Sequence, residues 1–155
     1  MHLVFIDTEF TDFTNPELIS IGLASTSGKD FYAEAQYTDS SCSEFVRKTV
    51  IPLLSRTHQM SDELLRMEIL KWLDSIRDTT PIVMCYDSDY DRMLFLRLFD
   101  SNPPSFLIFR GNGYRHINGL MRADFYSKNN LDEHHALSDA MALRYAFRGW
   151  TRSVQ

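Results

Sequence analysis

The chain has 155 residues, which suits a single domain built around one core. It is 44% hydrophobic and 24% charged, which is typical of a globular protein and excludes a disordered one. The net charge of -5 argues against a protein that binds nucleic acid on a broad basic surface. It does not exclude an enzyme that binds nucleic acid at a local site or through metal ions.

The cysteine usage and the apolar runs predict a cytoplasmic protein. Cys42 and Cys85 have no metal-ligand spacing, and a reduced protein is the simplest interpretation. No apolar run approaches the roughly 18 residues of a membrane span, so no membrane partner is expected. The N-terminal apolar stretch is interrupted at Asp7, which is not typical of a secretory signal.

The first third of the chain predicts three strands. Residues 3–6 form a continuous apolar run, as in a strand covered on both faces. Residues 17–24 and 31–37 follow as further strands, with turn chemistry around Gly28 between them. These three strands indicate an antiparallel meander.

The rest of the chain alternates helices and strands. Residues 43–54 predict a short helix that stops near Pro52, and Ser61 caps a longer one. Its apolar residues recur at helical spacing: Leu65, Ile69, Trp72 and Ile76. Residues 82–86 predict a fourth strand, 90–99 a buried helix and 106–109 a fifth strand, whereas 110–130 gives no clear element. The last helix begins near Ala136, and its apolar face contains Ala140, Leu143, Phe147 and Trp150. We therefore predict an α/β fold: a mixed five-stranded sheet with flanking helices, in one domain spanning 1–155.

Two carboxylates end the first strand. Asp7 and Glu9 are two positions apart, so they face the same way at the carboxyl end of a buried strand, where open α/β sheets bind ligands. Two such anions repel each other and lose hydration, and a hard divalent cation such as Mg²⁺ removes both penalties. The alternative is that they are polar residues where a strand emerges into solvent.

Two further clusters stand at helix starts. Asp91 follows an aromatic residue and precedes an apolar helix face, whereas Asp87 and Asp89 suit turn or N-cap positions. His134 lies five positions before Asp139, on the first turn of the last helix. Taken alone, Asp139 is also explained by the positive end of a helix, and the histidines by a loop.

Together these motifs resemble the DEDDh 3′–5′ exonucleases of the ribonuclease H-like superfamily. The order is Asp-x-Glu on the first strand, an aromatic residue with Asp91 on a middle helix, and His-x4-Asp on the last. The segments "FIDTEF", "ELISIG" and "FVRKTVIPLL" are similar to small stand-alone bacterial exoribonucleases. The resemblance implies a ribonuclease H-like sheet and a phosphodiester hydrolase that releases nucleoside 5′-monophosphates from 3′ ends. It favours RNA over DNA as the substrate, and a homodimer is compatible with it.

The resemblance also implies roles for individual residues. The metal ligands would be the carboxylates of Asp7, Glu9, Asp91 and Asp139, holding two Mg²⁺ ions that Mn²⁺ can replace. His134 would be the general base beside Glu9 in the catalytic set. Phe10 and Thr11 would lie near the terminal nucleotide, although Phe10 is equally well explained as core.

Two departures from the family pattern leave questions open. Asp12 stands where oligoribonucleases usually carry Gly, which bears on substrate length. His135 has the x3 spacing of the tyrosine in the related DEDDy group, so the base is either His134 or His135. Arg110 and Arg115 suit phosphate contacts but also a solvated loop.

Three rival functions are compatible with parts of the pattern. The first is a DNA-directed exonuclease of the same family. The second is a haloacid-dehalogenase-type phosphatase, whose Asp-x-Asp-x-Thr pattern is close to "DTEFT"; Glu9 is wrong for its second acid. The third is a non-catalytic nucleic-acid-binding module, which has no need of four acids and a histidine.

Overall fold

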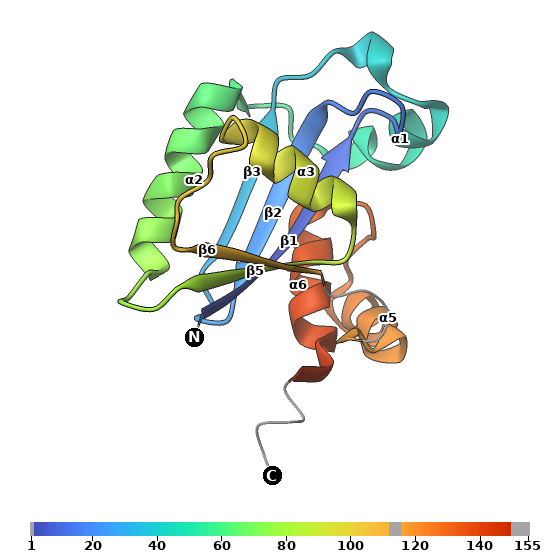
Figure 1. The fold of residues 1–155 in the computed structure, drawn as a ribbon. Helices are drawn as coiled ribbons and strands as arrows, with labels where there is room; N and C mark the ends of the chain where they lie inside the picture. Colours follow the sequence, from blue (N-terminus) through green and yellow to red (C-terminus); the bar gives the residue numbers. More distant parts are fainter. Residues whose placement is uncertain (1, 112–115, 150–155) are drawn as a thin grey trace.

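The protein contains a mixed sheet with helices on both faces (Figure 1). The structure, a computed structural model, describes residues 2–111 and 116–149. Among these residues six strands lie in the order β4-β3-β2-β1-β5-β6. They are β1 (His2–Phe10), β2 (Leu18–Ser25), β3 (Asp30–Ala35), β4 (Gln59–Met60), β5 (Ile82–Tyr86) and β6 (Leu107–Gly111). The predicted α/β class and mixed sheet are confirmed. The sheet has one strand more than the five predicted, because the two-residue β4 pairs with the end of β3.

The strand directions follow the prediction. β1, β2 and β3 form the antiparallel meander, and β5 and β6 continue the sheet in parallel on the other side of β1. β1 is thus a central strand, and Val4, Phe5 and Ile6 are fully buried. This explains why its sequence is a continuous apolar run rather than an alternating one.

Five α-helices are described, and they lie on both faces of the sheet (Figure 1). Their bounds are α1 (Glu44–Thr49), α2 (Asp62–Ile76), α3 (Asp89–Leu98), α5 (Gly119–Asn129) and α6 (Ala136–Ala146). α2 and α3 cover one face and build the larger core with the strands. α6 covers the other face, and α5 packs against α6. No helix in the described ranges is long and apolar enough to cross a membrane.

The predicted cap of the long helix is present. Ser61 accepts a hydrogen bond from the Leu64 amide at the start of α2. Leu65, Ile69 and Ile76 are buried as their spacing predicts, and the predicted Trp72 packs only partly buried against the same core. Serine at the N-cap satisfies an amide that has no partner within the helix, which fixes where α2 begins.

The segment without a predicted element contains helix α5. Asn118 caps it by accepting hydrogen bonds from the amides of Leu120 and Met121. The pair Asn118-Gly119 is also a strong turn signal, so the sequence alone does not predict a helix there. The predicted Phe147 packs edge-on against Phe5 at 5.3 Å, whereas Trp150 lies outside the described residues.

A glycine brings the start of α6 against the sheet. A Cβ on Gly22 of β2 would lie 2.3 Å from the Ala136 carbonyl oxygen, so only glycine allows this approach. Gly22 is paired with Asp7 of β1. The close contact therefore carries the first turn of α6, which contains Asp139, to the place where Asp7 lies.

The parallel strands β1 and β5 separate before β1 ends. Their pairing covers only His2–Phe5 of β1, whereas pairing with β2 continues to Phe10. Asp7 and Glu9 therefore lie beyond the last contact with β5. Open α/β sheets bind ligands outside the carboxyl ends of their strands, and Asp7 and Glu9 lie at such an end.

Candidate metal centre

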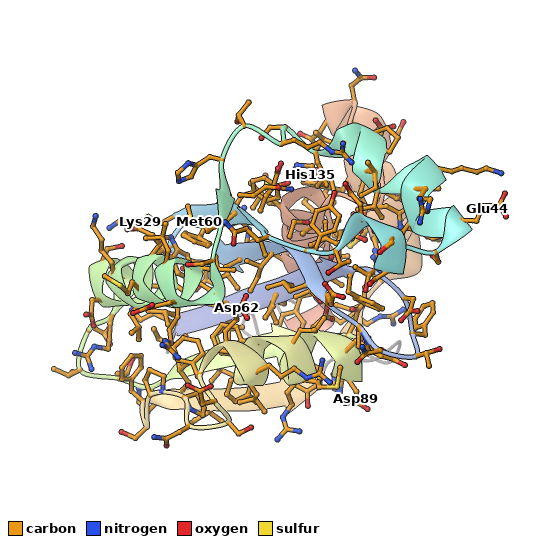
Figure 2. All side chains as sticks on the ribbon, turned by 90° about the horizontal axis from the view of Figure 1, so that it is seen from above. Lys29, Glu44, Met60, Asp62, Asp89 and His135 are labelled. Atoms are coloured by element: carbon orange, nitrogen blue, oxygen red, sulfur yellow. The ribbon has the colours of Figure 1, made fainter. Side chains whose placement is uncertain are left out.

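A cavity of about 490 Å³ opens at the carboxyl end of β1. Figure 2 shows Glu44 and Asp89, at the starts of α1 and α3, at the same end of the sheet. The wall combines residues of β1, α1, α3, α5 and α6 with the segment after β1 and the segments before α1, α3 and α6. The lining residues are Asp7, Thr8, Glu9, Phe10, Asp12, Phe13, Ser43, Phe45, Val46, Ser88, Asp91, Arg122, Glu133, His134 and Asp139. All the predicted metal ligands, the predicted base and Phe10 are among them.

The acidic side chains form two groups around this cavity. Ligand atoms of Glu9, His134 and Asp139 all lie within 4.8 Å of one another, and the same holds for Asp7, Asp87 and Asp91. The resemblance implied Asp7, Glu9, Asp91 and Asp139 as ligands of two metal ions, and each of the two groups contains two of them. Asp87 was predicted at a turn or N-cap position, and the structure adds it to the second group.

Hydrogen bonds hold Asp91 in place from both sides. The Thr8 amide (2.9 Å) and hydroxyl (2.7 Å) donate to its Oδ1, and the Ser88 amide donates to Oδ2 (3.2 Å). The contact with Ser88 completes a capping box at the start of α3. Asp91 therefore ties α3 to the last part of β1, and its oxygens are fixed beside Asp7 by two independent elements.

Asp139, on the first turn of α6, also accepts hydrogen bonds at both carboxylate oxygens. The Tyr126 hydroxyl of α5 donates to its Oδ1 (2.7 Å), and the His134 amide donates to Oδ2 (3.1 Å). Such contacts from neighbouring groups orient carboxylates that bind metal ions. Tyr126 was not among the predicted site residues, because the helix that carries it was not predicted.

Burial makes the charged form of this cluster costly. Asp7 is 9% exposed, Asp91 2% and Asp139 5%. Burial, followed by the charges of Asp91, Asp139 and Glu9, raises the pKa of Asp7. The pKa of Glu9 rises to about 8, first through burial and then through the charge of Asp139.

The pKa values of Asp91 and Asp139, on the first turns of α3 and α6, are also raised. Burial raises the pKa of Asp91 to about 7, although the hydrogen bonds from Thr8 act in the opposite direction. Burial likewise raises the pKa of Asp139 against the hydrogen bonds from Tyr126 and His134. Each carboxylate would be deprotonated more easily if a positive charge lay between the groups.

The donor set fits hard divalent cations. Buried carboxylate oxygens suit Mg²⁺ or Mn²⁺, and no thiolate lies among the described residues that line the cavity. A bound cation would offset both the desolvation and the mutual repulsion of the carboxylates. The arrangement can therefore bind a metal ion, as the pair Asp7 and Glu9 predicts.

The two histidines have different surroundings. His134 lines the cavity with φ at 67°, and its ring meets the exposed Phe45 edge-on at 5.1 Å. His135 caps α6, with its Nδ1 3.5 Å from the Ser138 amide, and stacks on Tyr32 at 4.5 Å. Figure 2 labels His135. Only His134 is thus placed in contact with the cavity.

Aromatic rings form part of the cavity wall. Phe10 stacks on Tyr90 at 4.9 Å and meets Phe13 edge-on at 5.3 Å. Phe13 is 72% exposed, and the Tyr90 hydroxyl donates to its carbonyl oxygen. The structure does not bring Thr11 to the wall: it is fully buried, and its hydroxyl accepts from the Glu17 amide.

The remaining predicted contacts lie elsewhere. Asp12 accepts hydrogen bonds from the Thr14 and Asn15 amides and so shapes the loop beside the cavity. Arg110 is an exposed residue of β6 outside the cavity wall, and Arg115 lies outside the described residues.

The chain matches no protein-family model and no curated protein sequence. The resemblance to the exonucleases therefore stays a prediction.

Proposed function

We propose that the protein is a metal-dependent 3′–5′ exonuclease that releases nucleoside 5′-monophosphates, with RNA as the favoured substrate and DNA as the alternative. The observation that carries the proposal is the convergence of Asp7, Glu9, Asp91 and Asp139 on one cavity together with His134. These residues come from three separate elements and from a loop. A structural role explains each of them singly, but not why four carboxylates share a buried site.

The chemistry of phosphodiester hydrolysis fits this donor set. Two bound Mg²⁺ ions would activate the attacking water and offset charge on the attacking and leaving oxygens. Asp7, Glu9, Asp91 and Asp139 would hold the ions, and the hydrogen bonds from Thr8 and Tyr126 keep two of these carboxylates oriented.

His134 is the residue proposed to take a proton from the attacking water. It lines the cavity and belongs to the same group as Glu9 and Asp139. The hydrogen bond from its backbone amide to Asp139 and the ring of Phe45 define the position of the loop that carries it. A positioned general base contributes about 10²–10⁴-fold to such a reaction.

The aromatic wall supports a nucleic-acid substrate. Phe13 and Phe45, which line the cavity together with its carboxylates, are 72% and 54% exposed. A nucleotide has an anionic phosphate for a metal site and a base whose face stacks on aromatic rings. A simple phosphate monoester has no need of exposed aromatic rings, which makes a phosphatase the weaker interpretation.

The proposal is tested with RNA and DNA oligomers labelled at either end, in Mg²⁺, Mn²⁺ or EDTA. We expect stepwise loss from the 3′ hydroxyl end, 5′-monophosphate products, faster cleavage of RNA, and no reaction in EDTA or with a 3′-phosphate end. Asp7→Asn should be inactive. Asp89→Asn is the matched control, because Asp89 is exposed on the first turn of α3 and lies outside the cavity wall. Internal cuts in a circular substrate, or full activity in EDTA, would contradict the proposal.

A further inference from the structure

Among the described residues of the cavity wall, one is an arginine and several are acids. Six of its residues are carboxylates, and Arg122 of α5 is the only Lys or Arg among the residues known to line it. Arg122 was not singled out by the sequence, because no helix is predicted there. A polyanionic substrate that reaches the described part of this wall meets one permanent positive charge from a side chain.

The guanidinium is linked to both carboxylate groups. Arg122 Nη1 donates to Asp87 Oδ2 at 3.1 Å, and Asp87 belongs to the group with Asp7 and Asp91. Arg122 also interacts with Tyr126, whose hydroxyl donates to Asp139 in the other group. The position of Arg122 is thus set by both halves of the candidate metal centre rather than by the surface of α5.

The side chain is held but still reaches the cavity. The exposed fractions are 31% for the Arg122 side chain and 25% for Asp87. A guanidinium has five N–H donors in a planar fork, so it can keep Asp87 as a partner and present other donors to a phosphate oxygen. Because Asp87 already holds the guanidinium in place, less conformational entropy is lost when a phosphate binds.

We infer that Arg122 binds a phosphate of the nucleic-acid chain next to the scissile one, with Asp87 as its positioning residue. The inference rests on the proposed nuclease function and adds a substrate-binding residue to it. Metal ions account for the scissile phosphate, and Arg122 supplies the charge for the adjacent one. The acidic wall then excludes anions that cannot engage both.

The first test compares Arg122→Gln and Arg122→Lys with Lys128→Gln in steady-state cleavage of a short RNA. Lys128 is the matched control because it is on the same helix and is also paired with an aspartate, Asp124 at 2.7 Å, but lies outside the cavity wall. Arg122→Gln should lower kcat/KM by about 10- to 100-fold, mainly through KM, which is typical of a lost charge-assisted contact. Arg122→Lys should restore part of this loss, and Lys128→Gln should change little.

The salt dependence of KM gives a second readout. Loss of one phosphate contact on a single strand should reduce the slope of log KM against log salt by about 0.7 in Arg122→Gln. The same slope should be unchanged in Lys128→Gln. A purely structural role of Arg122 would lower the unfolding temperature without moving the slope.

Substrates with one neutral methylphosphonate linkage test whether Arg122 contacts a particular phosphate. When the neutral linkage is at the position bound by Arg122, wild type should slow down, whereas Arg122→Gln should lose nothing further. Additive effects at every upstream linkage would overturn the inference while leaving the nuclease function intact. A wild-type protein that cleaves neither RNA nor DNA would overturn the proposed function, and this inference with it.

Discussion

Replacing Glu9 by glutamine should stabilise the metal-free protein while abolishing its activity. Burial and the charges of Asp139 and Asp91 raise the pKa of Glu9 from 4.5 to about 8. The folded protein therefore keeps a proton that the unfolded chain loses at lower pH. Its stability falls as the pH rises from about 4.5 to about 8. Glutamine keeps the size of the side chain and removes the charge, so the variant escapes this loss.

The size of the stabilisation in Glu9→Gln follows from the raised pKa of Glu9. One pKa unit corresponds to about 1.36 kcal/mol. Because the open cavity lets solvent reach Glu9, we expect Glu9→Gln to gain ~2–4 kcal/mol at about pH 8, less than the full shift would give. For a domain of this size this corresponds to a rise of about 5–10 °C in Tm. Near pH 4 the gain should disappear, since wild-type Glu9 is then neutral in both states.

Thermal unfolding in EDTA, followed by circular dichroism from about pH 4 to pH 9, measures the difference. Glu68→Gln on α2 is the control, because Glu68 lies away from the cavity, and its effect should stay within about 0.5 kcal/mol. Added Mg²⁺ should stabilise wild type more than Glu9→Gln at high pH. A variant no more stable than wild type at pH 8 in EDTA would refute the electrostatic reasoning.

Three further predictions concern the residues that assemble the site. Gly22→Ala should lower Tm and abolish activity, because the added methyl group displaces the start of α6; unchanged Tm in a scan would contradict this packing. Tyr126→Phe should weaken Mg²⁺ binding about 10- to 100-fold in calorimetry, since Asp139 loses its 2.7 Å hydrogen bond; equal affinity would exclude an orienting role. His134→Ala should lower kcat about 10²–10⁴-fold with metal affinity nearly unchanged, whereas His135→Ala should mainly lower stability through its lost cap. The reverse pattern would assign the base to His135.

The sequence predicts those features of the fold that depend on neighbouring residues, such as apolar runs and helix caps. The apolar run of β1 and the Ser61 cap of α2 are both present as expected. Helix α5 is the exception, because Asn118-Gly119 is equally a turn signal and only packing against α6 selects the helix. The extra strand β4 also has no local signal, since its two residues become a strand only by pairing with β3.

The candidate site divides in the same way. Alternation along a strand determines that Asp7 and Glu9 project together, and the sequence by itself shows this. The approach of α6 over Gly22 and the separation of β1 from β5 bring Asp139 and Asp91 to them, and these depend on contacts between distant segments. The pairing of Asp87 with Arg122 joins residues 35 positions apart, for which spacing carries no information. The sequence thus determined which carboxylates are available, and the tertiary structure decided which of them share one buried cavity, because burial and mutual repulsion exist only once the elements pack.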